Sequence, residues 1–543
     1  MNSKLLLFLI YVATFQISSA QEISISINKS TLDSISVQDV PSNAPGIATA
    51  IVYQGKVVYS KYAGFANLSD KTLINQSSLF NIASNGKQFT ALAILELIDE
   101  KKINLADDIR TWLPKLFPSI SEKITIAHLL THSSGIRDCY DLWSLKGIIW
   151  WKNSFDNRDV IRIIEQQNEL NFPPGSQYLY SNSNYILLAA IIEKVSGISF
   201  VQYTNELFRK LNMKNTFFVD KETKLPKSIA HAYFNFDTWT TFDWKWKVSG
   251  DGNLFTTLED QIQWERLLQG YGESKVKQKL LEESQKLCSE SSIKNYGYGL
   301  EFGEFISKKC TFHEGATGAW KATTLRFNEM NLAFVTLTNS GKTIPAQQTR
   351  QLAAKVLKNE NVNSFLTKPT SIGPFISNEA ILGTYLTENK FAFSFINKEG
   401  KIFLQRSGRN DVELERESDN IFHQKYDPDF KQEFIRLNNG KLIVTAYYTN
   451  HAPYSLTKTT PINSNFNPKS WNGSYFNTET KTHIKIKYIS DNNFKITFLD
   501  NMSTEGKLIS EQQILVDNYL LKKSDNGILL DGERIKNVSF NKE

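Results

Sequence analysis

The segment Ser84-Asn85-Gly86-Lys87 carries two groups that can act together in nucleophilic chemistry. Residues i and i+3 share one face of a helix, so the Ser84 hydroxyl and the Lys87 amine can meet if a helix begins here. A serine becomes a nucleophile when a partner takes its proton, and a lysine can be that partner when burial and neighbouring charges lower its pKa. A helix N-terminus would also stabilise negative charge on Ser84. The pattern alone is common, but here it opens an apolar helix that has no other reason to bury a lysine.

A second polar segment, Tyr180-Ser181-Asn182, follows the turn Pro173-Pro174-Gly175. A tyrosine beside a cation can shuttle protons as general base and general acid. An asparagine amide can both orient a lysine and hold a substrate carbonyl. Taken alone, a tyrosine and an asparagine at this spacing are typical of a surface loop.

A third segment, His313-Glu314-Gly315, is followed by Ala316-Thr317-Gly318. Gly315 would let a substrate backbone approach the strand closely. A backbone N–H just beyond it could join that of Ser84 as an oxyanion hole. Taken alone, His313 is typical of an ordinary strand end.

Strands and helices that could position these segments are visible in the apolar pattern. Residues 47–52 and 57–62 are β-prone and flank Gln54-Gly55, which predicts a hairpin. Residues 322–327 and 332–339 predict two further strands. Between these strand regions, residues 89–98 and about 185–195 are apolar nearly all round, which predicts buried helices, the second ending at Gly197. Strands at both ends with helices between predict an α+β domain.

The character of the chain changes near residue 360. Residues 366–376 carry two prolines among polar residues, which indicates a linker. Beyond it, apolar residues alternate with others in two similar stretches about ninety residues apart: Phe391, Phe393, Phe395, Ile402 and Leu404, then Ile484, Ile486, Tyr488, Phe494, Ile496 and Phe498. Related openings, Gly383-Thr384-Tyr385 and Gly473-Ser474-Tyr475, precede them. We expect two related antiparallel β modules, each a small barrel or sandwich, with one larger β domain as the alternative.

The N-terminus predicts export. Lys4 is followed by an apolar run at 5–15, and Ser18-Ser19-Ala20 suits cleavage after Ala20. The run is shorter than the roughly 20 residues that span a bilayer, and no later stretch is long enough. We therefore expect a periplasmic or extracellular protein without a transmembrane segment.

Composition sets further bounds. A length of 543 residues predicts several domains, and a net charge of +6 without a long basic run argues against a nucleic-acid partner. The three cysteines, Cys139, Cys288 and Cys310, allow at most one intramolecular disulfide.

The order of the three polar segments, together with their flanks, resembles the serine β-lactamase and penicillin-binding superfamily, in particular its class C β-lactamase-related branch. The flanks that carry the resemblance are Phe80-Asn81-Ile82-Ala83, His128-Leu129-Leu130-Thr131-His132-Ser133-Ser134-Gly135-Ile136, Pro174-Gly175 and residues 250–260. The resemblance covers residues 40–360. It implies a β-lactamase/transpeptidase-like domain, with an antiparallel sheet flanked by helices and a helical lobe. The β modules resemble the lipocalin-like C-terminal domains of several family members, and D-aminopeptidases of this branch carry two.

The expected organisation is thus a signal peptide at 1–20, a serine hydrolase domain at 21–362, and β modules at 376–460 and 466–543. By resemblance, Ser84 forms an acyl-enzyme, Lys87 and Tyr180 share the proton transfers, and water releases the product. Asn182 would position the substrate, and His313 would take the place often held by a lysine. The resemblance implies no metal and no organic cofactor.

Also by resemblance, the Ala316 N–H would lie opposite that of Ser84, beside Gly315. The third segment departs from most β-lactamases and DD-peptidases, which commonly have Thr or Ser where this chain has Glu314. If Glu314 faces the cleft, it repels a substrate carboxylate by about 1 kcal/mol in water and more at lower dielectric. A substrate ammonium would then be favoured. If Glu314 points away, the argument does not hold.

The sequence therefore predicts a hydrolase of small peptide, amide or ester substrates, foremost a peptidase or amidase of D-amino-acid-containing or cell-wall-type substrates. The alternatives are an esterase or β-lactamase of the same fold, and a non-catalytic cell-wall ligand-binding protein. His128 and His132 have the i, i+4 spacing of a metal pair, but no third ligand is evident in the sequence. The oligomeric state is left open.

Overall fold

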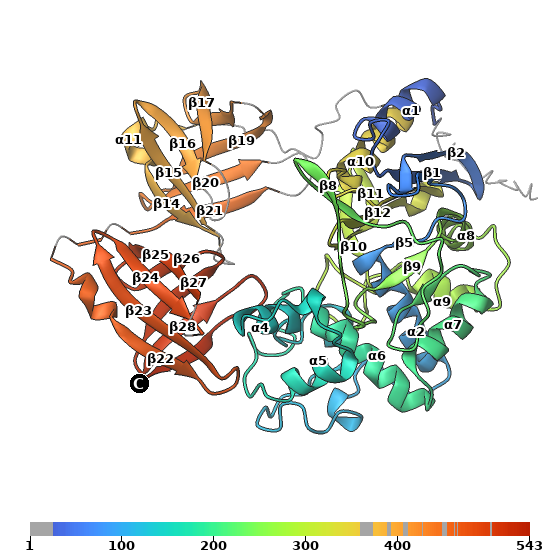
Figure 1. The fold of residues 1–543 in the computed structure, drawn as a ribbon, viewed down its shortest axis with the longest axis horizontal. Coiled ribbons are helices and arrows are strands. Elements are labelled where there is room, and N and C mark those ends of the chain that lie inside the picture. The colour runs from blue at the N-terminus through green and yellow to red at the C-terminus, as the bar shows by residue number, and fades with distance from the viewer. Residues whose placement is uncertain are drawn as a thin grey trace, which may run out of the picture.

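The computed structural model describes residues 25–358, 373–387, 392–405, 411–425, 427–447, 453–460, 462–463, 465–499 and 502–543. Figure 1 shows an α+β unit followed by two β-barrels. The predicted fold class is confirmed, and the C-terminal part consists of two modules. Residues 366–372 of the expected linker and Phe391 lie outside the described residues.

A sheet of six antiparallel strands, counted over the described residues, forms the centre of the α+β unit, in the order β10-β11-β12-β13-β1-β2. The strands are β1 (Ile47–Tyr53), β2 (Lys56–Ala63), β10 (Glu301–Phe305), β11 (Lys308–Thr317), β12 (Trp320–Phe327) and β13 (Leu332–Thr338). The expected hairpin is confirmed: Gln54 and Gly55 both have positive φ, 48° and 72°, as a tight two-residue turn requires.

Helices cover both faces of this sheet because successive strand residues point to opposite sides. On one face, Ile51 shares a buried apolar cluster with Leu352 of α10 (Pro345–Val356) and Leu32 of α1 (Lys29–Val37). On the other face, Ala50 belongs to a larger cluster that includes Leu92 of α2 (Lys87–Asp99) and Leu267 of α8 (Leu258–Leu268).

Two helices that are buried nearly all round form the centre of the helical lobe. In α2 every residue from Lys87 to Leu97 is buried, and α6 (Asn182–Ser196) ends at Gly197 in the left-handed conformation. Both predicted helices are thus confirmed. The other helices are α3 (Ile126–Leu130), α4 (Cys139–Leu145), α5 (Asn157–Ile164), α7 (Phe200–Lys210) and α9 (Gln278–Glu283).

We expected no transmembrane segment, and the lengths of the helices can be compared with the thickness of a bilayer. Over the described part of the chain, no single helix is both long and apolar enough to cross a bilayer. The pair α6 and α7 meets the length and composition test together, but the two helices are bent by 87°.

Short strands connect the sheet to the lobe. In one three-stranded sheet, β9 (Leu254–Thr256) lies between β5 (Phe80–Asn81) and β6 (Phe217–Phe218). The remaining short strands are β3 (Phe65–Asn67), β4 (Thr72–Leu73), β7 (Tyr233–Phe236) and β8 (Thr238–Thr241). The pairing of β5 with β9 brings the segment before Ser84 next to the segment after Asp251.

Each C-terminal module is a closed barrel of eight antiparallel strands within the described residues. Barrel 1 contains β14 (Gly383–Leu386), β15 (Ala392–Lys398), β16 (Lys401–Gln405), β17 (Val412–Ser418), β18 (Ile421–Gln424), β19 (Asp427–Arg436), β20 (Leu442–Tyr447) and β21 (Tyr454–Lys458). Barrel 2 contains β22 (Gly473–Asn477), β23 (Thr482–Ser490), β24 (Asn493–Phe498), β25 (Met502–Ser510), β26 (Gln513–Val516), β27 (Tyr519–Ser524), β28 (Gly527–Asp531) and β29 (Val538–Lys542). In both, the tyrosine of the opening strand donates its hydroxyl to the carbonyl four residues earlier, Tyr385 to Ile381 and Tyr475 to Trp471. This shared bond supports the expected relation between the modules.

Barrel 2 docks on the helical lobe beside α4, as Figure 1 shows. Its apolar interior is continuous with the lobe's buried cluster, whereas barrel 1 has a cluster of its own. At the contact, the fully buried Arg137 side chain pairs with Glu479 at 2.7 Å. The Arg534 N–H donates to the Asp141 carboxylate at 2.8 Å.

Candidate active site

Ser84 lies in a 3-10 turn, Ala83–Gly86, that runs directly into α2. We expected the helix to begin near Ser84; the α-helix begins at Lys87 and the serine occupies the tighter turn before it. Ala83, immediately before the serine, has φ 48°, a region that L-residues rarely adopt. Such backbone strain collects at functional sites when the surrounding structure holds it in place.

Strand β11 supplies the surrounding structure. It pairs with β10 only from Lys308 to Phe312, so within the described ranges the edge from His313 onward has no strand on that side. The turn that carries Ser84 lies against this open edge. A Cβ placed on Gly315 would be 2.2 Å from the Ile82 carbonyl oxygen and 3.1 Å from the Ser84 nitrogen. Only glycine allows this approach, which sets the backbone edge, including Ala316, alongside the nucleophile.

Lys87 lies at the centre of the site, with its side chain fully buried. Its ammonium nitrogen is 3.1 Å from the Ser84 hydroxyl oxygen, 2.9 Å from Asn182 Oδ1 and 2.6 Å from the Asp251 carbonyl oxygen. Burial lowers the pKa of Lys87 to about 8, against an opposing effect of the Asp251 carboxylate. About a tenth of the amine is therefore neutral at pH 7, and more at higher pH, and this neutral form can accept a proton.

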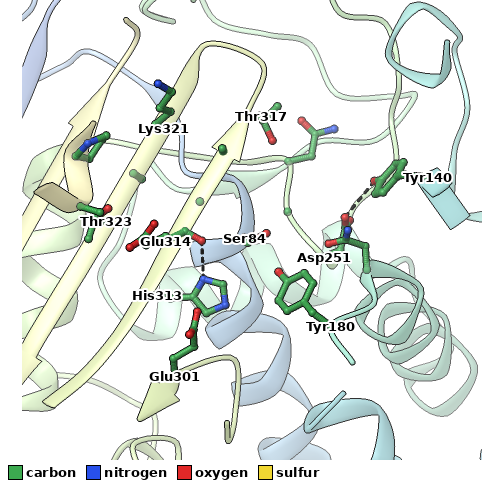
Figure 2. Close-up of a pocket in the computed structure, with 18 of the residues that line it drawn as sticks. Ser84, Tyr140, Tyr180, Asp251, Glu301, His313, Glu314, Thr317, Lys321 and Thr323 are labelled. Carbon is green, nitrogen blue, oxygen red and sulfur yellow. Dashed lines mark hydrogen bonds between the residues drawn. The ribbon is translucent and has the colours of Figure 1, made fainter. Parts of the chain in front are cut away.

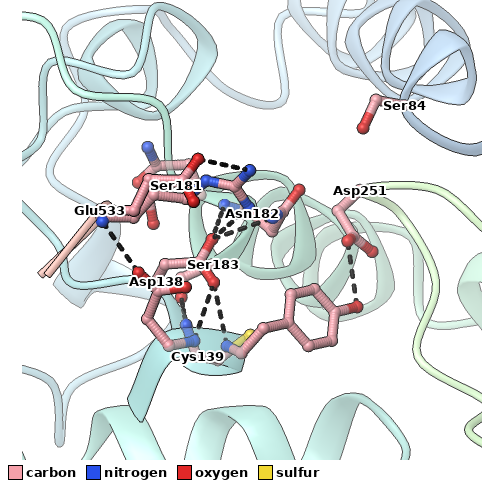
Figure 3. A network of polar contacts seen from close by, with 12 residues as sticks. Ser84, Asp138, Cys139, Ser181, Asn182, Ser183, Asp251 and Glu533 are labelled. Carbon is pink, nitrogen blue, oxygen red and sulfur yellow. Dashed lines mark hydrogen bonds and ion pairs between the residues drawn. The ribbon is translucent and has the colours of Figure 1, made fainter. Parts of the chain in front are cut away.

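Asn182 is held in one orientation by the lobe, as Figure 3 shows. The buried Asp138 carboxylate accepts hydrogen bonds from its backbone N–H at 2.6 Å and from its side-chain amide at 2.9 Å. Because Nδ2 donates to Asp138, Oδ1 is left to accept from Lys87. The sequence-predicted pair Lys87 and Asn182 is thus joined directly.

Tyr180 lies over the lysine, with Lys87 Nζ 4.9 Å from its ring centroid. Burial raises the pKa of Tyr180, and interaction with the Ser84 side chain acts in the opposite direction. The ring of His132 packs against it, 4.2 Å between centroids. His132 Nδ1 accepts from the Ser181 N–H, which fixes the imidazole beside the tyrosine.

His313 is buried and does not supply a cation at this site. Its Nδ1 contacts the Glu314 carbonyl at 2.8 Å, and its Nε2 contacts the Tyr296 hydroxyl at 3.0 Å. Burial and the nearby Lys87 lower the pKa of His313 to about 3. The imidazole is therefore neutral at ordinary pH, unlike the lysine whose place the resemblance gives it.

Glu314 lines the cleft and also pairs with Arg350 of α10 at 3.3 Å. Figure 2 shows the Glu314 carboxylate directed away from Ser84, on the side of β11 where Arg350 lies, and this pair partly balances its charge. Glu301 of β10 lines the same wall, and burial, with a smaller effect of Glu314, raises its pKa to about 7.

These groups surround a cleft of about 500 Å³, drawn in Figure 2. Of the sequence-predicted residues, it is lined by Ser84, Tyr180, Asn182, His313, Glu314, Gly315 and Ala316. Lys87 lies beneath Ser84. The sequence reasoning did not single out Tyr140, Asp141, Asp251, Glu301 or Arg534, which also line it.

Two of these additional residues form a pair on the lobe side, where the Tyr140 hydroxyl donates to the Asp251 carboxylate at 3.0 Å. Asp251 falls within the stretch 250–260 that carried part of the resemblance, so that stretch held a signal for it. The sequence held no signal for Arg534, because this residue lies in a short loop of barrel 2 between β28 and β29.

His128 and His132 have separate structural partners. His128 caps α3 by accepting from the Thr125 N–H, and His132 packs on Tyr180. No group of three or more His, Cys, Asp or Glu side chains suited to a metal ion occurs among the described residues. Cys139, Cys288 and Cys310 are buried and unpaired.

Two features of the site are those of a serine hydrolase. The serine can pass its proton to a buried amine, and the strand edge beside it is open to a substrate. A family model described as Beta-lactamase matches residues 37–358, more than half of the chain. The chain belongs to the beta-lactamase family and is a serine hydrolase.

Individual relatives agree with this assignment. The chain is similar to protein flp of Staphylococcus aureus (strain MRSA252), 27% identical over 69% of this chain and 77% of that protein. It is 26% identical to a D-aminopeptidase of Gluconobacter oxydans (strain 621H), over 63% of both chains. An octameric penicillin-binding protein homologue from Pyrococcus abyssi shares the fold, with a TM-score of 0.57 and 24% identity over 80% of this chain and 100% of that chain.

Proposed function

We propose that the protein hydrolyses amide bonds in small D-amino-acid-containing substrates through an acyl-enzyme on Ser84. The observation that carries the proposal is the 3.1 Å contact between Lys87 Nζ and the Ser84 hydroxyl oxygen. Neutral Lys87 accepts the Ser84 proton as the hydroxyl oxygen attacks the amide carbonyl. The Ser84 and Ala316 N–H groups stabilise the oxyanion.

Proton transfer to the leaving nitrogen follows from the position of Tyr180. Its hydroxyl interacts with the Ser84 side chain and its ring lies beside Lys87, so the phenol can give its proton to the departing amine while it takes the proton that Lys87 received from Ser84. Asn182 holds Lys87 and the substrate carbonyl. Water then attacks the acyl carbon and gives a proton to the Lys87–Tyr180 pair, the Ser84 ester bond breaks, and the pair returns that proton to the serine oxygen.

Substrate charge favours an amine-bearing acyl group. Glu301 and Glu314 line one wall of the cleft, and neutral His313 brings no positive charge there. The pKa of Glu301 is about 7, so the residue is ionised in part of the molecules at neutral pH. The ionised carboxylate attracts a substrate ammonium and repels a substrate carboxylate. Similarity to a D-aminopeptidase supports this choice over an esterase or β-lactamase.

We also propose that the chain is exported, with residues 1–20 removed as a signal peptide. The support is the sequence of Lys4, the apolar run at 5–15 and Ala20 at the cleavage point. An intact mass that corresponds to a chain starting at Gln21 would bear this out; a mature protein that retains Met1 would contradict it.

The first test is intact mass spectrometry of the mature protein after exposure to a fluorophosphonate probe, with Ser84→Ala as the control. We expect one adduct on the wild type and none on the variant. A screen of D-amino-acid amides, their L-enantiomers, esters and β-lactams then separates an amidase from an esterase or β-lactamase. The absence of an adduct on the folded protein would contradict every catalytic role given above and favour a ligand-binding protein.

A further inference from the structure

Arg534 reaches the catalytic cleft from barrel 2. Its guanidinium carbon is 5.4 Å from the centroid of the Tyr180 ring, and the residue lines the same cavity as Ser84. The side chain is 31% exposed and lines the cleft. A cation in this place belongs to the substrate-binding surface, although the residue lies in a different domain from the nucleophile.

The loop that carries Arg534 is held firmly. Its backbone N–H donates to Asp141 at 2.8 Å, and its carbonyl accepts from the Asn171 side chain at 3.1 Å and from the Asp138 N–H at 3.4 Å. The Lys536 N–H donates back to Asn171 at 2.7 Å. Four hydrogen bonds to the lobe fix the position from which the guanidinium projects.

The Arg534 guanidinium has more N–H donors than the close acceptors described around it. In the described part of the chain its recorded polar contacts are Glu533, at 3.4 Å and 76% exposed, and Asp138 at 3.9 Å. The second distance is too long for a hydrogen bond. The nearest Asp138 oxygen already accepts two hydrogen bonds from Asn182. A guanidinium offers five N–H donors in a fork that matches a carboxylate.

The proton transfer to the leaving nitrogen indicates which part of the substrate lies near Arg534. The leaving nitrogen must lie beside Tyr180 to receive its proton, and Arg534 lies over the Tyr180 ring. Glu301 and Glu314 line the β11 side of the cleft. The two ends of a bound substrate therefore face opposite charges, with the acyl group at the acidic wall and the leaving group at Arg534.

We propose that Arg534 binds a carboxylate on the leaving group, so that the preferred substrate is a short peptide with both termini free rather than a simple amino-acid amide. This rests on the proposed acyl-enzyme function. The products are an amino acid and a second amino acid or peptide, since water supplies the OH of the new carboxyl group and the leaving nitrogen gains the proton.

The test measures how well ligands protect Ser84 from the fluorophosphonate probe, using D-alanylglycine and D-alanylglycinamide with the full-length protein. We expect the wild type to be half-protected at a concentration of the free acid about tenfold or more below that of the amide. Arg534→Gln should bring the two within about twofold, and Arg534→Lys should keep part of the preference. Lys536→Gln, which changes another cation of the same loop, is the matched control and should behave as the wild type.

Hydrogen exchange of α4 verifies that barrel 2 remains docked in the Arg534 variants, and Arg534→Lys serves as the second variant if Arg534→Gln undocks it. Equal protection of the wild type by both ligands would overturn the inference while leaving the acyl-enzyme intact. So would an Arg534→Gln variant that weakens both ligands equally, since Arg534 would then act through Tyr180. If the wild type is not labelled at all, the proposed function fails and this inference with it.

Discussion

At the scale of single residues, burial sets the protonation of the cleft. It lowers the pKa of Lys87 and His313 and raises those of Glu301 and Tyr180. All four shifts favour the uncharged form, as expected where water is excluded. The same effect that makes Lys87 a usable base removes the charge of His313.

The pH dependence of Ser84 labelling follows from the lysine. Because the neutral amine accepts the proton and the pKa of Lys87 is lowered to about 8, the rate of fluorophosphonate labelling should rise as pH increases through about 8 and then level off. Lys87→Gln should lower the rate by about a hundredfold or more. The labelling rate is measured with stopped assays between pH 6 and 10. A rate that keeps rising to the ordinary lysine pKa would show that burial does not act as described.

Glu314→Gln tests the acidic wall. The variant should lower kcat/KM for a D-amino-acid amide by up to about fivefold, because it removes a partly exposed negative charge near the proposed place of the substrate ammonium. The N-acetylated amide, which has no ammonium, is the matched substrate and should react at an unchanged rate. Equal losses on both substrates would mean that Glu314 acts on the strand rather than on the ammonium, through its pair with Arg350.

Site residues could be predicted from the sequence where the type of residue alone determines its chemistry. Ser84, Lys87, Tyr180 and Asn182 could be proposed from spacing and resemblance, and they lie together. The neutral state of His313 could not, because it depends on burial and on the charge of Lys87, which comes from a separate segment.

At the scale of elements, the site depends on a strand edge that is left open. Strand β10 stops pairing with β11 at Phe312, and the turn that carries Ser84 occupies the place beyond it. The apolar composition of residues 89–98 was enough to predict the buried helix α2. The 3-10 turn before it was not predicted, because its geometry depends on contact with β11 rather than on its own sequence.

Gly315→Ala tests this contact. The added methyl would collide with the Ile82 carbonyl at 2.2 Å, so the free energy of unfolding should fall by about 1–3 kcal/mol. Labelling of Ser84 should slow as well, since the turn must move. The control is Gly303→Ala in β10, where the added methyl would meet only the Phe312 ring, at 3.2 Å. Denaturant titration of both variants gives the comparison; similar losses would argue against the close approach.

At the scale of the whole molecule, barrel 2 is part of the hydrolase rather than an appendage. Its apolar interior joins the lobe cluster, and the buried Arg137 pairs across the contact with Glu479. Two β modules could be predicted from the repeated pattern. Their docking could not, because it rests on a few polar residues in short loops that have no periodic signal.

Glu479→Gln should weaken this docking. It removes the negative charge that lies 2.7 Å from the fully buried guanidinium of Arg137, and loss of one member of a buried pair costs up to about 3–5 kcal/mol. We expect faster hydrogen exchange in α4 and β22. Glu169→Gln is the control, since Glu169 pairs with the same arginine but is 59% exposed and should contribute at most about 1 kcal/mol. Indistinguishable exchange in the two variants would place the strength of the contact in the apolar cluster instead.

The position of Arg534 also has a consequence for the order in which the site is assembled during folding. During synthesis, N-terminal domains generally fold before those that follow. The unit that carries Ser84 and Lys87 would thus be complete while one wall of its cleft was still to be made. Until barrel 2 had docked, the site would hold its nucleophile but lack the cation that selects the leaving group, so selectivity would be acquired later than reactivity.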